Sequence, residues 1–537
     1  MSDALSAERP IRPRASQEFM YEIFDIIVNE MAKQNYNVAS IPKEVKNVIA
    51  KLTKAGFEGY IVGGCCRDFL QGIEPNDWDV TTNARPEEIQ KIFQDNFYEN
   101  AFLTVTILTK SKIPTLKEIE ITTFRSEAKY TDKRHPDQIK FAKTLQEDLS
   151  RRDFTINAIA LKLKSKNEKG KTKVKKSKID DYEVIDLFGG QDDLKNKIIR
   201  AVGDPDKRFN EDALRLMRAA RLATVLRFKI ETKTKQAIVK NASLLKFISP
   251  ERIRDEFIKV IMADNAAEGV ELLHELGLLK SVVPELEEGI GVSQNKHHTY
   301  NCWNHNVLSL DYAAKKKFGF EVRLASLFHD IGKPRAKRGE GPNATFYNHE
   351  IIGARMTQKI LEHLKFPQEQ AKKIVLLVRY HLFYYNVGEV GESSVRRLVK
   401  NVGLENFQQL LEVRMSDRIG SGVPKAEPYK LRHLKYMAEK VSQDPLSAKM
   451  VKVNGNDVME ILKIKPGPKV GQILSVLLNL VIEDPKKNKK DVLKKEINRL
   501  GVLADKDLAG LAEKAEKEIQ NVEQKKDEMT REKYWVT

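Results

Sequence analysis

Hydrophobic and polar positions follow two different periods along this chain. Between Gly56 and Thr123, β-branched residues alternate with polar ones in short runs bounded by turn residues, which predicts the strands of a small mixed sheet. After Asp186, apolar residues recur every three or four positions, as in NEDALRLMRAARLATVL, and this spacing predicts a series of helices. The same period from Ser16 to Lys33 predicts a docking helix. The pattern therefore indicates a multidomain α+β protein whose larger part is all-α.

Changes in this pattern divide the chain into five parts. The segment from Lys162 to Lys178 carries nine lysines against one acid and is typical of an exposed hairpin tip. Pro284 and the glycines after it mark a boundary further along. We expect an N-terminal helical extension, a mixed-sheet head, a helical neck and body, a helical part that contains most of the histidines, and a helical tail, at residues 1–40, 41–190, 191–295, 296–450 and 451–537.

The composition is that of a folded, cationic protein. Of 537 residues, 41% are hydrophobic and 31% charged, which excludes wholesale disorder. No apolar run reaches the ~18–20 residues that cross a bilayer, and the N-terminus lacks the apolar stretch of a secretion signal, so we expect no membrane segment. Three cysteines cannot form a disulfide framework, which favours a cytoplasmic protein. The net charge of +17 predicts a polyanionic partner, and both nucleic acid and a membrane surface satisfy it.

A glycine pair at a predicted strand-to-helix junction suggests a phosphate site. Gly63 and Gly64 follow the predicted strand Tyr60–Val62 and let backbone N–H groups approach an anion, while the helix start supplies partial positive charge. Arg67, one turn later, can clamp the same anion bidentately. Gly-Gly turns are common, so the motif alone also fits an ordinary tight turn.

Paired carboxylates follow the glycine pair. On a strand, Asp77 and Asp79 share a face, and two like charges so close repel each other unless a cation lies between them. Carboxylate oxygens suit Mg²⁺, which completes its shell with water and substrate phosphates. Glu120, on a later strand, is a candidate third acid. Such a site can hold two metals, one that activates a hydroxyl and one that stabilises leaving pyrophosphate.

Two later motifs carry polar side chains at helical spacing. Within RRDFTIN, Arg152 precedes Asp153 and Asn157, which are i and i+4 on a predicted helix and suit triphosphate and ribose hydroxyls. Within EDALR, Asp212 and Arg215 are i and i+3 and can lie across one base edge. Cytosine and adenine both offer an amine donor beside a ring-nitrogen acceptor, whereas uracil and guanine reverse that pattern. This pair therefore predicts selection of CTP and ATP without a template, although an ordinary intrahelical ion pair has the same spacing.

Two further arginines extend the EDALR motif. Arg218 and Arg221 continue the same helix face at three-residue steps, where they can hold phosphates.

Histidines and aspartates in the C-terminal half form a second constellation. Two imidazoles and two carboxylates make a mixed nitrogen and oxygen site for a divalent transition metal or Mg²⁺, and water bound there can attack a phosphoester. Two accessory histidines can add a second metal or hold phosphate. The four principal residues are His305, His329, Asp330 and Asp417, and the accessory pair is His349 and His381. Any one of these histidines alone also fits a structural role.

In order, these motifs resemble those of the tRNA nucleotidyltransferase/poly(A) polymerase family, bacterial-eukaryotic class. The matching runs are GYIVGGCCRDFL, NDWDVTT, EITTFR, RRDFTINAIA, DLFGG, EDALRLMRAAR and ERIRDEF. The run FHDIGK with the histidines around it is similar to the HD phosphohydrolase superfamily. The resemblance implies a polymerase-β-like nucleotidyltransferase head followed by an all-α neck, body, HD domain and tail.

The resemblance also implies an activity. Members add C and A to the tRNA 3′ end from CTP and ATP with release of pyrophosphate, so tRNA, CTP, ATP and Mg²⁺ are the expected partners and cofactor. It implies that RRDF selects ribonucleotides, that arginines after EDALR contact the nucleotide, and that the motif from Glu251 to Glu256 supports the base-reading helix. The loop from Arg125 to Pro136 favours addition of CCA or of A.

Alternatives to this activity stay open at the level of sequence. Poly(A) polymerases and A-adding tRNA nucleotidyltransferases have nearly the same head motifs. The HD site implies a possible phosphohydrolase activity, with a divalent metal of uncertain identity, but a vestigial scaffold that binds RNA competes with it. A protein of another class, an HD phosphohydrolase with a merely RNA-binding head, is the third alternative.

Overall fold

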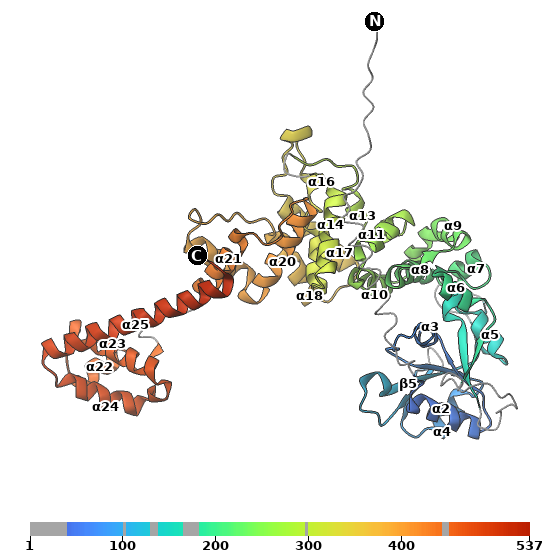
Figure 1. The fold of residues 1–537 in the computed structure, drawn as a ribbon, viewed down its shortest axis with the longest axis horizontal. Helices are drawn as coiled ribbons and strands as arrows, with labels where there is room; N and C mark the ends of the chain where they lie inside the picture. The colour runs from blue at the N-terminus through green and yellow to red at the C-terminus, as the bar shows by residue number, and fades with distance from the viewer. Residues whose placement is uncertain are drawn as a thin grey trace, which may run out of the picture. The chain divides into compact units, whose positions relative to one another are not determined.

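In the computed structural model, the chain forms two compact units (Figure 1). The first contains the residues up to Ala263 together with Glu268–Val282, and the second contains Asp264–Ala267 and the residues from Val283 onward. The structure describes residues 40–99, 104–128, 138–164, 182–295, 299–442 and 450–536. The helix expected from Ser16 to Lys33 lies outside these residues, as do most of the lysines of the expected hairpin tip.

A seven-stranded mixed sheet forms the head of the first unit, as the alternating pattern predicts. The strand order is β3-β4-β5-β2-β1-β8-β9. The β2 and β5 strands run parallel, and the other neighbouring pairs are antiparallel. The strands are β1 (Gly59–Val62), β2 (Asp79–Thr82), β3 (Asn96–Glu99), β4 (Thr104–Leu108), β5 (Glu118–Thr123), β8 (Ile159–Leu163) and β9 (Tyr182–Asp186). Because β8 and β9 pair as a hairpin, the strands on both sides of the expected lysine-rich tip are confirmed.

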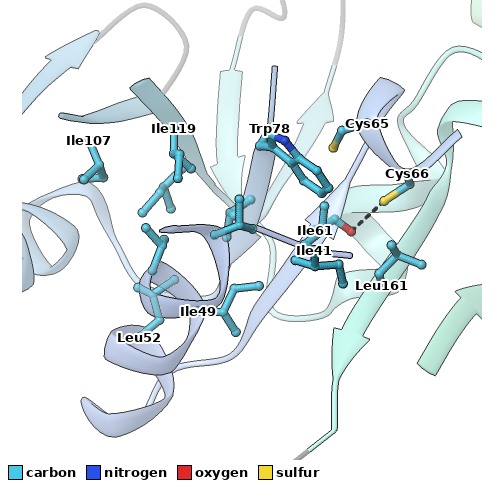
Figure 2. Packing of buried hydrophobic residues seen from close by; sticks show 14 of the residues in the cluster. Ile41, Ile49, Leu52, Ile61, Cys65, Cys66, Trp78, Ile107, Ile119 and Leu161 are labelled. Atoms are coloured by element: carbon cyan, nitrogen blue, oxygen red, sulfur yellow. Dashed lines mark hydrogen bonds between the residues drawn. The ribbon is translucent and has the colours of Figure 1, made fainter. Parts of the chain in front are cut away.

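The core of the head lies between this sheet and the helix α2 (Lys43–Lys54). The helix buries Val45, Val48, Ile49 and Leu52, whose three- and four-residue spacing places them on one face. Figure 2 shows this face packed beneath isoleucines of the sheet, with the Trp78 ring at the far side. Burial of such side chains, each contributing about 1.5–3 kcal/mol, holds the strands that carry the site in register.

Short helices and a second hairpin complete the head. They are α3 (Gly64–Leu70), α4 (Pro86–Ile92), α5 (Leu145–Ser150), the 3₁₀ turn η2 (Thr155–Asn157), β6 (Arg125–Ala128) and β7 (Gln138–Phe141). The loop expected from Arg125 to Pro136 begins in β6, and the rest of it lies outside the described residues.

Beyond the head, the first unit is mainly helical, as the three- to four-residue period predicts. The main helices are α6 (Gly190–Asn196), α7 (Pro205–Glu211), α8 (Leu214–Leu226), α9 (Thr232–Asn241), α10 (Pro250–Met262) and α12 (Leu279–Val282). The α8 helix is buried along most of its length and packs against α10. These helices therefore present the charged residues of α8 towards both α10 and the head.

The second unit is built from helices. Its main helices are α14 (Cys302–Lys315), α15 (Phe320–Phe328), α17 (His349–His363), α18 (Gln368–Tyr380), α19 (Glu392–Val402), α20 (Leu404–Gly420), α21 (Tyr429–Ser442), α22 (Gly455–Leu462), α23 (Pro468–Glu483), α24 (Lys490–Gly501) and α25 (Asp505–Tyr534). The last four enclose a hydrophobic cluster of their own. Long α25, red in Figure 1, returns to α21, where Tyr436 donates a 2.6 Å hydrogen bond to Asp527. No helix in the described part of the chain is long and apolar enough to span a membrane.

Gly190 sets the contact between α6 and η2 and supplies a stability test. A Cβ there would lie 2.2 Å from the Thr155 carbonyl oxygen and 2.8 Å from Ile159 Cγ1. Because the Thr155 carbonyl belongs to the backbone and cannot move away without displacing η2, Gly190→Ala is expected to lower the free energy of unfolding of the first unit by about 2–3 kcal/mol. The matched control is Gly471→Ala in α23, where a Cβ meets open space and helix propensity favours alanine. Calorimetry measures the stability of each variant, and equal melting temperatures for Gly190→Ala and Gly471→Ala would contradict this packing.

Candidate functional site

Three carboxylates gather where β2 runs beside β5. Asp79 is the first residue of β2, and Glu120 lies directly opposite it in the parallel register. Asp77 lies in a bend before β2, so the prediction that both aspartates lie on a strand is wrong. The physical reason is Trp78, which is 3% exposed and turns into the core, where its ring contacts Phe69 edge-on at 6.1 Å.

The charge of this cluster is poorly compensated. Burial, and then the neighbouring charge of Asp77, raise the pKa of Asp79 to about 7. Glu120 also raises this pKa, and the guanidinium of Arg152 lowers it without restoring the ordinary value. A cation among these oxygens would remove the repulsion, and an all-oxygen donor set suits Mg²⁺. The residues therefore fit the expected magnesium.

The glycine pair lies against this cluster. Gly63 has φ of +87°, and a Cβ there would lie 3.2 Å from both Arg152 Nη1 and Asp79 Oδ2. Only glycine lets the backbone approach both groups in this conformation. Gly64 begins α3 and lies beside the guanidinium of Arg67, which is paired with the carboxylate of Asp68 at 2.7 Å.

The RRDF motif is not an α-helix, and that prediction is wrong. Residues 151–153 form a turn, and η2 follows, because the backbone here pairs with a distant segment: Thr155 N donates to Arg200 O at 2.9 Å and Val202 N donates to Asp153 O at 3.1 Å. Asp153 and Asn157 nevertheless face each other, since Asn157 Nδ2 donates to Asp153 Oδ1 at 3.3 Å. The expected proximity of the two side chains therefore arises from a 3₁₀ turn.

A chain of polar contacts joins the glycine loop to the helix α8. Arg67 Nη1 donates to Asn157 Oδ1 at 2.9 Å, Asn157 donates to Asp153, and Asp153 Oδ2 lies 2.6 Å from Arg218 Nη2. Burial raises the pKa of Asp153, but Arg218 and then Arg215 outweigh it and bring the pKa to about 2. The carboxylate is therefore ionised and holds α8 against the head.

The expected base-reading pair spans a helix break. Asp212 follows α7, and Arg215 lies in the first turn of α8, so the prediction of one continuous helix is wrong. Each side chain has another partner: Asp212 Oδ2 lies 3.1 Å from Arg252 Nη2, and Arg215 Nη1 lies 2.6 Å from Glu211 Oε2. The two remain adjacent, because Arg215 N donates to Asp212 O at 3.1 Å.

The remaining arginines of this region are also held by acids. Arg221 Nε lies 2.6 Å from Glu256 Oε2, so Glu256 holds α8 against α10. Sequence reasoning missed Asp148, a fully buried carboxylate that lies 2.8 Å from Arg151 Nη2 and 3.6 Å from Arg152 Nη2. The i+3 and i+4 spacing of these arginines from Asp148 is the signal that could have found it.

The second constellation converges in the second unit. The residues come from α14, α20, the N-terminus of α17 and the ends of α15 and α18, and all are buried. Two groups of three could hold a metal ion: His305, His329 and Asp330, and Asp330, His349 and His381. Asp417 lies beside the first group, with Oδ1 3.4 Å from His305 Nε2. The structure thus brings together all six residues that the sequence singled out.

The spacing and orientation of these ligands fit a metal. His305 Nε2 and His329 Nε2 lie 3.1 and 3.4 Å from Asp330 Oδ2, close to the roughly 3.0–3.4 Å between ligands that each lie about 2.1 Å from one ion. His329, His349 and His381 each place Nδ1 2.7–2.8 Å from a backbone carbonyl oxygen. Donation from Nδ1–H leaves Nε2 as the metal-binding nitrogen, the usual arrangement around protein metals.

The aspartates of this centre are ionised. Burial raises the pKa of Asp330, but Lys333 and then His329 outweigh it and lower the pKa well below the usual range. For Asp417, hydrogen bonds from His305 and His329 and the charge of Arg414 have the same net effect against burial.

A cavity of about 670 Å³ opens beside the centre. Asp330, His349, His381 and Asp417 contribute to its lining, together with the cations Lys333, Arg414 and Arg418. Sequence reasoning did not single out the two arginines, since only the tertiary structure places them at the cavity.

Three segments of the chain match known families. Residues 59–200 match the poly A polymerase head domain, residues 227–290 match the probable RNA and SrmB-binding site of polymerase A, and residues 297–453 match the HD domain.

Individual relatives match at two scales. The chain is 44% identical over 236 residues to the CCA-adding enzyme of Lactobacillus helveticus. This match covers 44% of this chain and 54% of the relative, so the chain spans about half of that relative's length. It is 31% identical over 462 residues to the CCA-adding enzyme of Enterococcus faecalis, covering 85% of this chain and 96% of that relative.

A solved structure matches over a similar span. The CCA-adding enzyme of Bacillus stearothermophilus, in complex with CTP, is 26% identical, covers 86% of this chain and 98% of its own, and has a TM-score of 0.52. Sequence and fold agree over the head, the RNA-binding helices and the HD domain, and the chain belongs to the CCA-adding enzyme family.

Proposed function

We propose that this protein adds C and A to the 3′ end of tRNA, using CTP and ATP and releasing pyrophosphate. The observation that carries the proposal is the pairing of Asp79 with Glu120 across parallel strands, with Asp77 and Gly63 beside them. The CTP bound by the Bacillus stearothermophilus relative supports the nucleotide class. The buried cysteines are free thiols, which supports a cytoplasmic setting for the reaction.

In this proposal the head carboxylates bind magnesium and the glycine loop binds the triphosphate. Asp77 and Asp79 would hold Mg²⁺, with Glu120 assisting, and the metal would neutralise phosphate charge and lower the pKa of the attacking hydroxyl. The backbone at Gly63 and Gly64, with Arg152, contacts phosphate oxygens. Asp153 and Asn157 face the ribose, and Arg67 orients Asn157.

Asp212 and Arg215 select the base in the same proposal. Their carboxylate and guanidinium would accept from the exocyclic amine and donate to the ring nitrogen of cytosine or adenine. Arg252 and Glu211 hold the two side chains in place. Arg218 pairs with Asp153 at 2.6 Å but keeps 35% of its side chain exposed, so that it can also reach the nucleotide, whereas Arg221 is engaged with Glu256 and is 17% exposed.

The domain boundaries follow the same assignment. We place the head at 41–190, the neck and body at 191–295, the HD domain at 296–450 and the tail at 451–537. The family matches at 59–200, 227–290 and 297–453 fall within or close to these limits.

A single incorporation assay separates the polymerase alternatives. Purified protein receives transcripts that end before CCA, after C and after CC, with each nucleotide supplied separately. Growth by CCA supports the proposal, growth by a single A after CC indicates an A-adding enzyme, and an open-ended A tail indicates a poly(A) polymerase.

The HD centre favours a second function, the metal-dependent hydrolysis of a phosphate ester. The observation that supports it is the cavity of about 670 Å³, which is lined by buried histidines and aspartates together with Lys333, Arg414 and Arg418. Those cations would bind the phosphoryl group, and metal-bound water would attack it.

Asp77→Ala separates the two activities. Loss of metal binding removes several kcal/mol of transition-state stabilisation, so incorporation is expected to fall by about 10³-fold or more. Hydrolysis at the HD centre is expected to persist, because its ligands belong to the other unit. Radiolabelled CTP incorporation and phosphate release measure the two, with exposed Glu74→Ala as the control. Retained incorporation by Asp77→Ala would refute the assignment of the head carboxylates, whereas phosphate release without any incorporation by the wild type would favour an HD phosphohydrolase with an RNA-binding head.

Asp79→Asn tests the strain of the metal-free cluster. With a pKa of about 7, Asp79 keeps its proton in the folded state at pH 5 but is ionised at pH 8, while the unfolded chain is ionised at both. The contribution of Asp79 to wild-type stability in chelator therefore falls as the pH rises, and the variant is expected to gain about 2–3 kcal/mol relative to wild type between pH 5 and pH 8. Thermal melts at the two pH values measure this gain. The exposed control Asp95→Asn is expected to differ from wild type in stability by the same amount at both pH values. The same result for Asp79→Asn would contradict the raised pKa.

Arg252→Ala tests the support of the base-reading carboxylate. Without its 3.1 Å partner, Asp212 loses its orientation, and the preference for CTP over UTP is expected to fall about tenfold, roughly 1.4 kcal/mol. Competition assays measure the ratio of kcat/KM values, with partial rescue expected from Arg252→Lys. Arg254→Ala, on the same helix but paired with Asp255, is the matched control. An unchanged ratio with reduced overall rate would indicate a purely structural role.

A further inference from the structure

Asp148 is a buried carboxylate of α5 that binds groups from several parts of the head. Its Oδ1 accepts from Arg151 Nε at 3.0 Å and Nη2 at 2.8 Å, and from the backbone N of Arg125 at 3.4 Å. Its Oδ2 accepts from the Thr81 hydroxyl at 3.3 Å and lies 3.6 Å from Arg152 Nη2. Burial raises the pKa of Asp148, but Arg151 and then Arg152 outweigh it and lower the pKa, so the carboxylate is ionised.

Two of these contacts tie the carboxylate to strands that flank the site. Thr81 lies on β2, two residues after Asp79, so its hydroxyl is placed by the same strand that carries the acidic cluster. Arg125 is the first residue of β6, which pairs with β7, so its backbone N–H is also placed by strand pairing. The position of Asp148 is therefore set independently of the arginine that its Oδ2 faces.

Arg152 extends from Asp148 to the glycine loop. Its Nη1 lies 3.2 Å from the position that a Cβ of Gly63 would take, and Asp79 Oδ2 lies at the same distance from that position. Nη1 donates to Asn157 O at 3.4 Å, and Nε is buried without an acceptor among the described residues. The protein thus engages few of the five N–H donors of this guanidinium, which leaves it able to bind an anion at the glycine loop.

We propose that Asp148 is a positioning residue for the triphosphate of the incoming nucleotide. It holds the Arg152 guanidinium beside Gly63 and Asp79, where the free donors of that guanidinium meet phosphate oxygens. This inference rests on the proposed nucleotidyl transfer, and it adds a residue that acts on the triphosphate only through Arg152. Its effect is the same for CTP and ATP, because both carry the same triphosphate.

Asp148→Asn tests the inference in the full-length protein. The amide oxygen can still accept from Arg151, but the NH₂ group in place of Oδ2 presents hydrogens to Arg152 and no longer holds it. The KM values for CTP and ATP are expected to rise about tenfold, with kcat and the preference for CTP over UTP nearly unchanged. Affinity for inorganic tripolyphosphate at fixed free Mg²⁺, measured by calorimetry, is expected to fall by the same factor. Glu147→Gln, an exposed neighbour whose amide oxygen can still accept from Lys143 N, is the matched control.

A double-mutant cycle separates positioning from a structural role. If Asp148 acts through Arg152, adding Asp148→Asn to Arg152→Ala leaves the affinity for tripolyphosphate at the value of Arg152→Ala alone. Additive losses, or an unchanged affinity in Asp148→Asn, would overturn the inference. If Asp148→Asn fails to fold, as judged by circular dichroism, Thr81→Val takes its place in the cycle. This variant removes one donor to Oδ2 and keeps the shape of the side chain, and its expected loss of affinity is about threefold.

Failure of this inference is distinguishable from failure of the proposed function. Normal KM values in Asp148→Asn, in a protein that incorporates both CTP and ATP, would overturn the inference alone. A wild-type protein that incorporates no nucleotide and binds no tripolyphosphate would overturn both.

Discussion

The head depends on the burial of like charges. Asp79 is forced beside Glu120 by the parallel pairing of β2 with β5, and Asp77 follows because Trp78 turns into the core. Hydrophobic packing under the sheet supplies the free energy that holds these carboxylates together (Figure 2). The cluster is thereby prepared for a cation before any ligand arrives, which is the preorganisation that electrostatic catalysis requires.

Burial raises the pKa values of the aspartates in both centres, but the neighbouring charges offset it in only one of them. In the head, the guanidinium of Arg152 does not offset burial and repulsion, and the pKa of Asp79 rises. In the HD domain, Lys333, Arg414 and the imidazoles outweigh burial, and the pKa values of Asp330 and Asp417 fall. The head therefore offers an all-oxygen donor set whose repulsion a cation would relieve, whereas the HD centre keeps its carboxylates ionised and adds imidazole nitrogens to them.

Side-chain ion pairs and hydrogen bonds connect polar groups of the first unit that lie far apart in sequence. The contacts from Arg67 through Asn157 and Asp153 to Arg218 join the glycine loop to α8, and Arg252 and Glu256 join α8 and its preceding break to α10. A change in the position of α8 would therefore alter contacts at both the glycine loop and the Asp212–Arg215 break.

The sequence by itself determined the mixed sheet, the helical remainder, the order of the motifs and the residues that both polar clusters bring together, because these depend on local periodicity and on residue identity. It did not determine the break between Asp212 and Arg215 or the 3₁₀ turn at Thr155–Asn157, since both are set by backbone pairing and packing with distant segments. Nor could it assign the partners of Asp148, Glu211 and Arg252, or place Asp330 between two pairs of histidines. Those contacts join residues on separate elements, and only the packing of the elements brings the charges within reach of one another.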